Sequence, residues 1–251
     1  MSAPDSQDRI AREQDFHNAR FTEEVREAQG KFYATIQHAF AAYNARVAEL
    51  AIGADVLEYG CAKGQRSVAL APRAKSVVGI DISEVGIGQA DELAAERGIA
   101  NCDFQVMNAE AMTLPDASFD LVFGSGILHH LDLERAYSEI ARVLRPGGRA
   151  VMWEPLGHNW LINWYRSKTP QARTPDEHPI LRRDIALARR YFGDVKLRFD
   201  GFTTLGMTPL RATPVFAAGY ALAQGLDKIL LSIPGLRWQA WFVLMELRKA
   251  A

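Results

Sequence analysis

The sequence has few cysteines, no long apolar run and almost no net charge. Cys61 and Cys102 are its only cysteines, too few for a disulfide framework or a zinc ribbon. No stretch approaches the roughly 20 apolar residues of a membrane-spanning helix, and the N-terminus carries acids where an export signal needs an apolar core. The net charge of −1 attracts neither nucleic acid nor an anionic bilayer. These absences predict a cytoplasmic protein with no nucleic-acid partner and at most peripheral membrane contact.

The sequence does contain enough apolar residues for one large α/β domain. Hydrophobic residues make up 48% of its 251 positions. From Val56 onward, short apolar segments alternate with helical ones, which is typical of βαβ units around a parallel sheet. We expect strands at 55–59, 76–82, 103–108, 119–125, 149–154, about 195–204 and 239–247. We expect the intervening helices at 64–73, 84–97 and 133–145, with further helical segments at 181–192 and about 213–233.

Two kinds of segment lie outside this alternation. Residues 1–50 have apolar positions at helical spacings of three and four, and we expect them to form a helical lid on the domain of residues 51–251. Apolar and aromatic inserts at about 155–180 and 205–236 are expected to cap the substrate, because such additions to a shared core carry specificity. Packing on the sheet, a homodimer contact or a membrane edge remain alternatives.

A turn with two glycines, "GCAKG" at 60–64, follows the apolar segment "VLEY". Glycines let a ligand approach the backbone closely, and the helix that follows offers unpaired N–H groups. Asp81 ends the next strand, where an acid accepts hydrogen bonds from ribose hydroxyls. The turn lacks the G-x-G-x-x-G spacing that holds a pyrophosphate, which favours a sulfonium cofactor over a dinucleotide. A plain structural turn remains the alternative.

Four motifs, read together, carry a more specific signal. "VLEYGCAKG", "VVGIDIS", "MNAEAMTLPDASFDLVFGSGILHHL" and "RVLRPGGRAVMWEP" resemble the class I S-adenosylmethionine-dependent methyltransferases in order and spacing, over residues 54–155. "NAEA" followed by "LP" and "FD" is similar to the ubiquinone and menaquinone biosynthesis branch. The resemblance implies a doubly wound, Rossmann-like sheet of seven strands, mostly parallel with an antiparallel last strand. It also implies S-adenosyl-L-methionine as cofactor and S-adenosyl-L-homocysteine as product.

The resemblance further implies which positions hold this cofactor. The methionine portion would lie against the glycine turn and the end of the fourth strand, at Glu58, Gly60, Cys61, Ala62, Gly64 and Ser125. The ribose and adenine would meet the ends of the second and third strands, at Asp81, Ile82, Asn108 and Ala109. Tyr33 would belong to a lid over the cofactor. Two positions depart from the family pattern, since Ala62 replaces its middle glycine and Asn108 its usual acid.

Methyl transfer is an in-line displacement, and a general base helps when the acceptor is a hydroxyl or an acidic carbon. The candidates are His130, His129 and Glu154, at the expected carboxyl ends of the fourth and fifth strands. Of the two histidines His130 is favoured, and a packing role is the alternative for each of the three. An amine acceptor can dispense with a base.

The insert after the fifth strand carries His158, Trp160 and His178, which we expect beside the substrate. Turn or packing roles are their alternative. No H-x₃-H or C-x₂-C spacing is present, so no metal site is predicted. The sequence therefore predicts methyl transfer to a hydroxyl, carbon or amine of a small hydrophobic acceptor. The alternatives are S-adenosylmethionine binding without transfer, a macromolecular acceptor, and a nicotinamide-dependent dehydrogenase.

Overall fold

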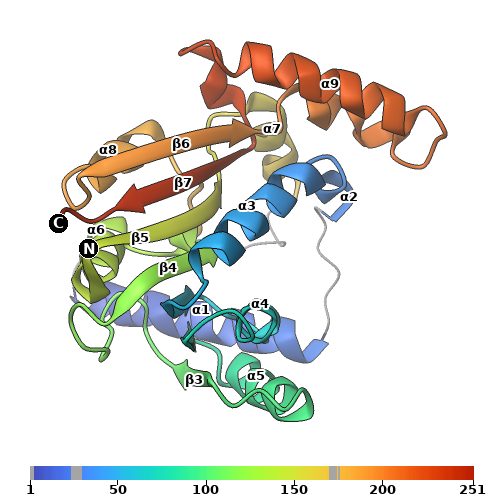
Figure 1. Ribbon diagram of the computed structural model, residues 1–251. Helices are drawn as coiled ribbons and strands as arrows, with labels where there is room; N and C mark the ends of the chain where they lie inside the picture. The colour runs from blue at the N-terminus through green and yellow to red at the C-terminus, as the bar shows by residue number, and fades with distance from the viewer. Residues whose placement is uncertain (1–2, 24–29, 170–173, 175) are drawn as a thin grey trace.

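The computed structural model describes residues 3–23, 30–169, 174 and 176–251 (Figure 1). The other residues of the expected lid and of the first insert lie outside the described part. A seven-stranded sheet in the order β3-β2-β1-β4-β5-β7-β6 forms the centre of the molecule. The strands are β1 (Asp55–Tyr59), β2 (Ser76–Asp81), β3 (Cys102–Val106), β4 (Phe119–Ser125), β5 (Leu144–Pro155), β6 (Asp194–Asp200) and β7 (Phe242–Arg248). Because β7 is antiparallel to β5 and β6 and the remaining pairs are parallel, the predicted fold class is confirmed.

Helices cover both faces of this sheet. On one face lie α3 (Gln37–Leu50), α4 (Gln65–Leu70) and α5 (Glu84–Glu96), and on the other lie α6 (Leu133–Val143) and α8 (Arg182–Ala188). This is the doubly wound arrangement that alternating strands and helices predict. The strand at 55–59 has its predicted bounds, and the helix predicted at 84–97 ends one residue earlier, at Glu96.

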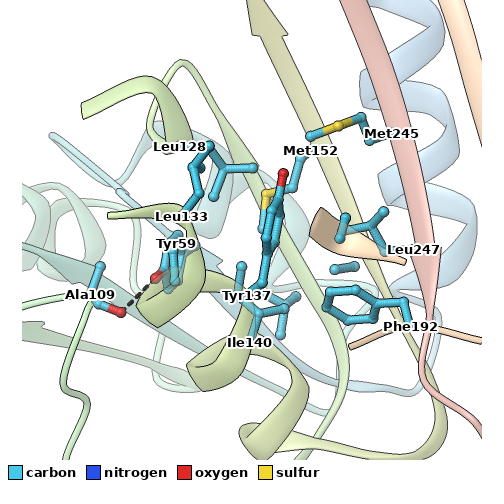
Figure 2. Packing of buried hydrophobic residues seen from close by; sticks show 14 of the residues in the cluster. Tyr59, Ala109, Leu128, Leu133, Tyr137, Ile140, Met152, Phe192, Met245 and Leu247 are labelled. Carbon is cyan, nitrogen blue, oxygen red and sulfur yellow. Dashed lines mark hydrogen bonds between the residues drawn. The ribbon is translucent and has the colours of Figure 1, made fainter. Parts of the chain in front are cut away.

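The core under α6 follows from the spacing of its apolar residues. Tyr137 and Ile140 lie on one side of the helix and are fully buried against Met152 of β5 (Figure 2). The Tyr59 hydroxyl donates a 2.5 Å hydrogen bond to the carbonyl oxygen of Ala109, which ties the end of β1 to the segment after β3. Burial of each large apolar side chain contributes roughly 1.5–3 kcal/mol, so this face supplies much of the stability.

Several predicted element boundaries differ from the structure by a few residues, and two of these differences have a clear local cause. Leu144 was expected in the helix that ends at Pro146, but it pairs with Phe119 and begins β5, with a register shift before the regular pairing resumes. The strand expected to reach residue 204 ends at Asp200. Gly201 follows with a φ of +81°, and a 3-10 helix, η3 (Thr203–Leu210), begins beyond it.

The predicted lid is not one helix. α1 (Ala3–Glu23) lies apart from α3 in Figure 1, and α2 (Gly30–Tyr33) precedes α3. The Gln14 side chain donates to the carbonyl oxygen of Ile82, so α1 crosses the end of β2, whereas α3 packs on a face of the sheet. The two parts of the predicted lid therefore lie in different places.

The late inserts contain α7 (Trp160–Lys168), η3, α9 (Phe216–Leu230) and η4 (Leu236–Gln239). α9 packs on η3 and leaves apolar side chains such as Leu222 and Ile229 exposed. The Asp227 carboxylate accepts hydrogen bonds from the backbone N–H groups of residues 202 and 203, which anchors α9 to the start of η3. Among the described residues, no helix is both long and apolar enough to cross a bilayer.

Candidate active site

A cavity opens at the carboxyl ends of the parallel strands. Strands β1 and β4 are neighbours in the sheet although they are not consecutive in the chain, and open α/β sheets bind ligands at such a reversal. The free space inside this cavity is about 40 Å³, so the cavity is narrow in this structure. Its wall includes five of the predicted cofactor residues, namely Gly60, Asp81, Ile82, Asn108 and Ala109. The remaining wall is mainly apolar, with Ile80, Met107, Ile127 and Leu131 from the sheet side and Ile10 from α1.

Asp81 connects this cavity to the glycine turn. Its Oδ2 accepts a 2.9 Å hydrogen bond from the backbone N–H of Ala62, and its Oδ1 accepts one of 2.9 Å from Ser83. Burial raises the pKa of the Asp81 carboxyl above its ordinary value, although the N–H groups of Ser83 and Ala62 oppose that rise. A carboxylate offers about four acceptor sites, so two remain for ribose hydroxyls. The cavity wall also carries the polar side chains of Arg9, Glu13, Glu110 and His130, which lie on α1 and in the segments after β3 and β4.

The turn itself is shaped by left-handed backbone and close packing. Gly60 has a φ of +77° and Gly64 a φ of +71°. A Cβ on Gly64 would lie 2.7 Å from the Cβ of Ala90 on α5, so only glycine lets the turn pack this closely. The Cys61 side chain is buried in the cluster between α4 and α5, and the described cavity does not include it or Gly64 in its wall.

Glu58 does not face the cavity directly. The structure buries it completely and surrounds its carboxylate with groups from the start of α4. Oε1 accepts a 2.8 Å hydrogen bond from the Arg66 guanidinium, and Oε2 accepts from the backbone N–H and the hydroxyl of Ser67 at 3.0 and 2.6 Å. Burial raises the pKa of Glu58, and the positive charge of Arg66 opposes this rise.

Arg66 is a site residue that sequence reasoning missed. Its guanidinium also donates to the Ser125 hydroxyl at 2.5 Å, so it lies between Glu58 and the end of β4. A cation here is positioned for a carboxylate such as that of a methionine group. Its signal in the sequence was weak, because an arginine in the first turn of a helix is usually a solvated side chain.

Glu154 and His129 form a buried pair at the ends of β5 and of the short 3-10 helix η1 (Leu128–His130). Glu154 Oε2 lies 2.8 Å from His129 Nδ1, and Glu154 Oε1 accepts hydrogen bonds from the backbone N–H groups of Ile127 and Leu128, each 2.9 Å long. Burial and the neighbouring His130 lower the pKa of His129, against the opposing effect of Glu154. This geometry orients His129 rather than the favoured His130.

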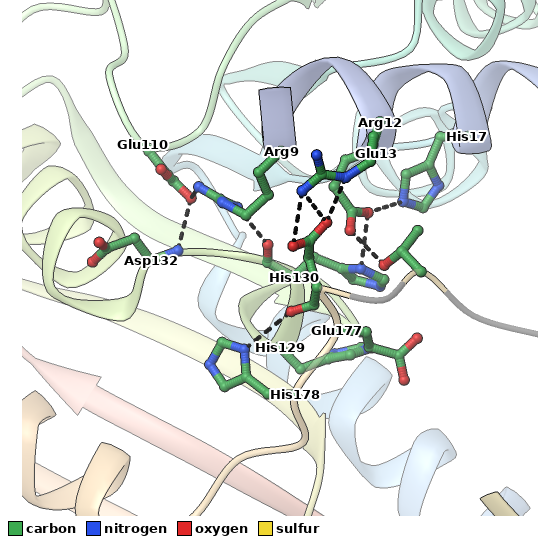
Figure 3. A network of polar contacts seen from close by, with 12 residues as sticks. Arg9, Arg12, Glu13, His17, Glu110, His129, His130, Asp132, Glu177 and His178 are labelled. Atoms are coloured by element: carbon green, nitrogen blue, oxygen red, sulfur yellow. Dashed lines mark hydrogen bonds and ion pairs between the residues drawn. The ribbon is translucent and has the colours of Figure 1, made fainter. Parts of the chain in front are cut away.

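His130 instead faces α1, which forms the outer wall of the cavity (Figure 3). Arg9 donates to the carbonyl oxygen of His130 at 2.8 Å and forms a 2.5 Å ion pair with Glu110. His130 Nδ1 lies 3.1 Å from a carboxylate oxygen of Glu13. Further out, Arg12 forms a bidentate ion pair with Asp176. These α1 residues are charged positions on a helix, which sequence reasoning treats as solvent-exposed, so it missed them.

The other predicted site residues lie away from the described cavity wall. His158 Nε2 accepts a hydrogen bond from the backbone N–H of Arg182 and so supports the start of α8. Trp160 is 70% exposed on α7, and His178 is exposed on the loop beside His129. The ring of Tyr33 packs against those of Trp241 and Phe242. Their expected cofactor and substrate roles remain predictions.

The fold is that of a Rossmann-like, doubly wound α/β domain with a cavity at the carboxyl ends of its parallel strands. Residues 57–152 match the family model described as a methyltransferase domain. The match spans β1 to β5 and therefore includes both the Asp81 side of the cavity and the loop that holds His129.

Three curated relatives match part of the chain. The uncharacterized methyltransferase YcgJ of Bacillus subtilis is 34% identical over 39% of this chain and 39% of its own length. Aklanonic acid methyltransferase DauC of Streptomyces is 36% identical over 44% of this chain and 52% of its own length. The ubiquinone/menaquinone biosynthesis C-methyltransferase UbiE of Hydrogenovibrio crunogenus is 44% identical over 31% of this chain and 32% of its own length. The aligned part thus spans about half or less of these relatives.

Solved structures extend the likeness of fold beyond the aligned sequence. The crystal structure of YcgJ from Bacillus subtilis superposes with a TM-score of 0.58 and 19% identity, and covers 86% of this chain and 99% of that one. The crystal structure of the [4+2]-cyclase SpnF superposes with a TM-score of 0.57 and 21% identity, and covers 85% of this chain and 80% of that one. At this identity the likeness establishes the fold alone.

Proposed function

We propose that this chain binds S-adenosyl-L-methionine in the described cavity and transfers its methyl group to a small, hydrophobic acceptor. The observation that carries the proposal is the position of Asp81. Its carboxylate lies in the wall of the cavity, at the carboxyl end of β2, and is held by the glycine turn through Ala62, with acceptor capacity left for ribose hydroxyls. Ile82, Asn108 and Ala109 complete the part of the wall assigned to the adenine.

The cofactor, when bound, supplies an activated methyl group on a sulfonium, and the chain supplies position and proton transfer. Asp81 orients the adenosine and Arg66 is placed to hold the methionine carboxylate. His129 is the proposed base for a hydroxyl or acidic carbon, because Glu154 fixes its Nδ1 side and the ring can accept a proton at Nε2. A positioned base contributes about 10²- to 10⁴-fold to such a step.

An aromatic cluster lies in the buried core on the α3 side of the sheet. Trp153 at the end of β5 stacks on Phe242 with ring centroids 4.0 Å apart and approaches Phe40 at 4.9 Å. Arg66 lies 6.0 Å from the ring of Tyr43, which places this cluster beside the proposed methionine end. DauC and UbiE are named for aklanonic acid and for quinone biosynthesis, which are small organic acceptors. The proposal therefore takes a small hydrophobic molecule as acceptor, with the methylated atom left open.

Calorimetry of the purified chain with S-adenosylmethionine and, separately, with NAD tests the cofactor assignment. We expect binding of the former in the micromolar range and none of NAD, because the turn lacks pyrophosphate spacing. Failure to bind S-adenosylmethionine at millimolar concentration would contradict the proposal. Mass spectrometry of incubations with hydrophobic phenols, quinols and amines would then detect a mass increase of one methylene. Binding without any transfer would favour a cofactor-binding protein instead.

The expected surroundings of the enzyme belong to the same proposal. We expect a cytoplasmic location, no nucleic-acid partner and at most peripheral contact with a membrane. The exposed apolar face of α9 is the surface on which a homodimer would form. Sedimentation analysis of the chain tests the dimer, and cell fractionation tests the location.

A further inference from the structure

Three potential metal ligands meet above the cavity, from two segments far apart in the sequence (Figure 3). Glu13 and His17 lie one turn apart on α1, and His130 ends η1. Glu13 Oε2 is 3.6 Å from His17 Nε2 and 3.1 Å from His130 Nδ1. All three ligand atoms lie within 4.8 Å of one another.

Two of these atoms are buried without a hydrogen bond. Glu13 Oε2 and His130 Nδ1 approach each other at 3.1 Å as an ion-pair contact, and neither atom has a further hydrogen-bond partner among the described residues. More than nine in ten buried polar groups are partnered in native proteins, and leaving one unpartnered costs about 1–3 kcal/mol. One cation between the two atoms would satisfy both.

The spacing and chemistry of the three atoms suit a transition metal. Bonds of about 2.0–2.2 Å in a tetrahedral site place neighbouring ligand atoms about 3.3–3.6 Å apart. The separations of 3.1 and 3.6 Å at Glu13 lie close to that range. Two imidazoles with one carboxylate is a donor set typical of Zn²⁺ and related divalent ions, whereas Mg²⁺ prefers oxygen ligands.

The surroundings leave Glu13 Oε2 available for an ion. The other oxygen, Oε1, accepts a 2.5 Å hydrogen bond from the Thr174 hydroxyl, which orients the carboxylate as second-layer partners of metal ligands do. The adjacent cation Arg9 is neutralised by Glu110 at 2.5 Å, so it does not repel a second positive charge strongly. His129 is already held by Glu154, so His130 is the histidine of η1 that remains for a metal.

We propose that Glu13, His17 and His130 bind a divalent transition-metal ion that fastens α1 over the cofactor cavity. Glu13 and His130 also line that cavity, so the fourth coordination position opens toward it and takes water or an oxygen of a bound molecule. The absence of H-x₃-H spacing predicted no metal, but that rule covers only neighbouring ligands. Here the fold brings α1 to η1.

Metal titration of the full chain tests this site without any assay of methyl transfer. The purified chain is stripped with a chelator, dialysed, and titrated with Zn²⁺ in competition with a chromophoric chelator. Co²⁺ serves as a second probe through its visible absorption. We expect one equivalent of Zn²⁺ bound at micromolar affinity or tighter, no competition from Mg²⁺, and at least tenfold weaker binding for Glu13→Gln, His17→Gln and His130→Gln.

His178→Gln is the matched control, because His178 lies on the neighbouring loop and is exposed. Its affinity for Zn²⁺ should equal that of the unmodified chain. Circular dichroism confirms that each variant is folded, and hydrogen exchange should show that Zn²⁺ slows amide exchange in α1 of the unmodified chain but not of His17→Gln. Less than one equivalent bound, or unchanged affinity in His17→Gln, would overturn the proposal. Either outcome is independent of S-adenosylmethionine binding, so the two proposals fail separately.

Discussion

The carboxylate of Asp81 accepts a 2.9 Å hydrogen bond from the backbone N–H of Ala62, a residue whose φ is +50°. This bond connects the end of β2 to the glycine turn after β1. Left-handed backbone costs a non-glycine residue roughly 1–2 kcal/mol. The position where the family has a glycine therefore keeps a glycine-like conformation although it carries alanine.

Replacing Ala62 by glycine should stabilise the chain. Relief of left-handed strain gains roughly 1–2 kcal/mol, and the greater freedom of the unfolded glycine takes back roughly 0.5–1 kcal/mol. We expect a net gain of about 0.5–1 kcal/mol by urea unfolding, with S-adenosylmethionine affinity unchanged. A loss of stability would show that the methyl group of Ala62 makes a packing contribution larger than the strain.

Replacing Asp81 by alanine should weaken S-adenosylmethionine binding by about 10- to 100-fold, since hydrogen bonds to a charged group contribute about 1.5–3 kcal/mol. Calorimetry measures the change. Asp103→Ala on the neighbouring strand β3 is the control, because Asp103 is exposed and lies outside the described cavity wall. Equal affinities for the two variants would exclude Asp81 from the ribose site.

Replacing Arg66 by methionine should destabilise the chain by about 3 kcal/mol, because it leaves the buried carboxylate of Glu58 without its cation. The double variant with Glu58→Gln should lose at least about 1 kcal/mol less than the sum of the single changes. Arg145→Met, which breaks surface ion pairs with Asp55 and Asp120, should cost under about 1 kcal/mol. Additive losses at Arg66 and Glu58 would contradict the coupling.

Gly64 and Gly53 have similar backbone conformations but different surroundings, so alanine at each position separates the cost of left-handed backbone from the cost of crowding. Gly64→Ala and Gly53→Ala each put a side chain at a φ near +70°, at +71° and +67° respectively. Each should lose roughly 1–2 kcal/mol for the left-handed conformation. Only the Cβ at residue 64 meets neighbours, at 2.7 Å from Ala90, which should add about 1–3 kcal/mol. Chemical unfolding of both variants measures the difference, and equal losses would show that the turn can move away from α5.

Low pH should lower the free energy of unfolding, because the Asp55 carboxylate at the start of β1 loses its charge. Lys75, Ser76 and Arg145 lower the pKa of this carboxyl to about 2, although burial opposes them. Because the folded pKa is below the ordinary value of 3.8, the stabilisation is complete above about pH 4 and is lost as the pH falls toward 2. We expect the loss to be about 1 kcal/mol, since solvent screens the partners.

Asp55→Asn should lower stability at pH 7 and flatten the unfolding free energy between pH 4 and about 2 relative to the unmodified chain. Asp116→Asn is the control, because Asp116 is exposed and lies far from this cluster in the sequence. An identical pH dependence in Asp55→Asn and the unmodified chain would rule out the assigned cause.

Replacing His129 by glutamine should preserve S-adenosylmethionine affinity within about threefold and lower turnover of a hydroxyl or carbon acceptor by about 10²- to 10⁴-fold. Glu154→Gln should act in the same direction, because the amide orients His129 less well. His158→Gln, which changes a contact at the start of α8, is the control. Full turnover in His129→Gln would exclude His129 as the general base. An acceptor that needs no base, such as an amine, would then be favoured.

The sequence alone determined the sheet, its strand bounds to within a few residues for most strands, and the cofactor edge. Alternation of apolar segments and the glycine turn are local properties, so Gly60 and Asp81 could be placed at neighbouring strand ends, and the family resemblance added Ile82, Asn108 and Ala109; all five line one cavity. The match to the methyltransferase domain model covers residues 57–152, most of the region of the four motifs. Parallel strands bring such ends together whatever the surrounding surface does.

Only the tertiary structure decided which polar groups meet. Arg66 pairs with Glu58 because the turn after β1 brings α4 back to the end of that strand, and His129 pairs with Glu154 because β4 and β5 are neighbours in the sheet. Glu13 reaches His130 because α1 crosses strands that lie far from it in the sequence. Side-chain pairing over long sequence distances depends on packing and desolvation, which leave no local pattern, so sequence reasoning favoured His130 as the base and predicted no metal ligands on α1.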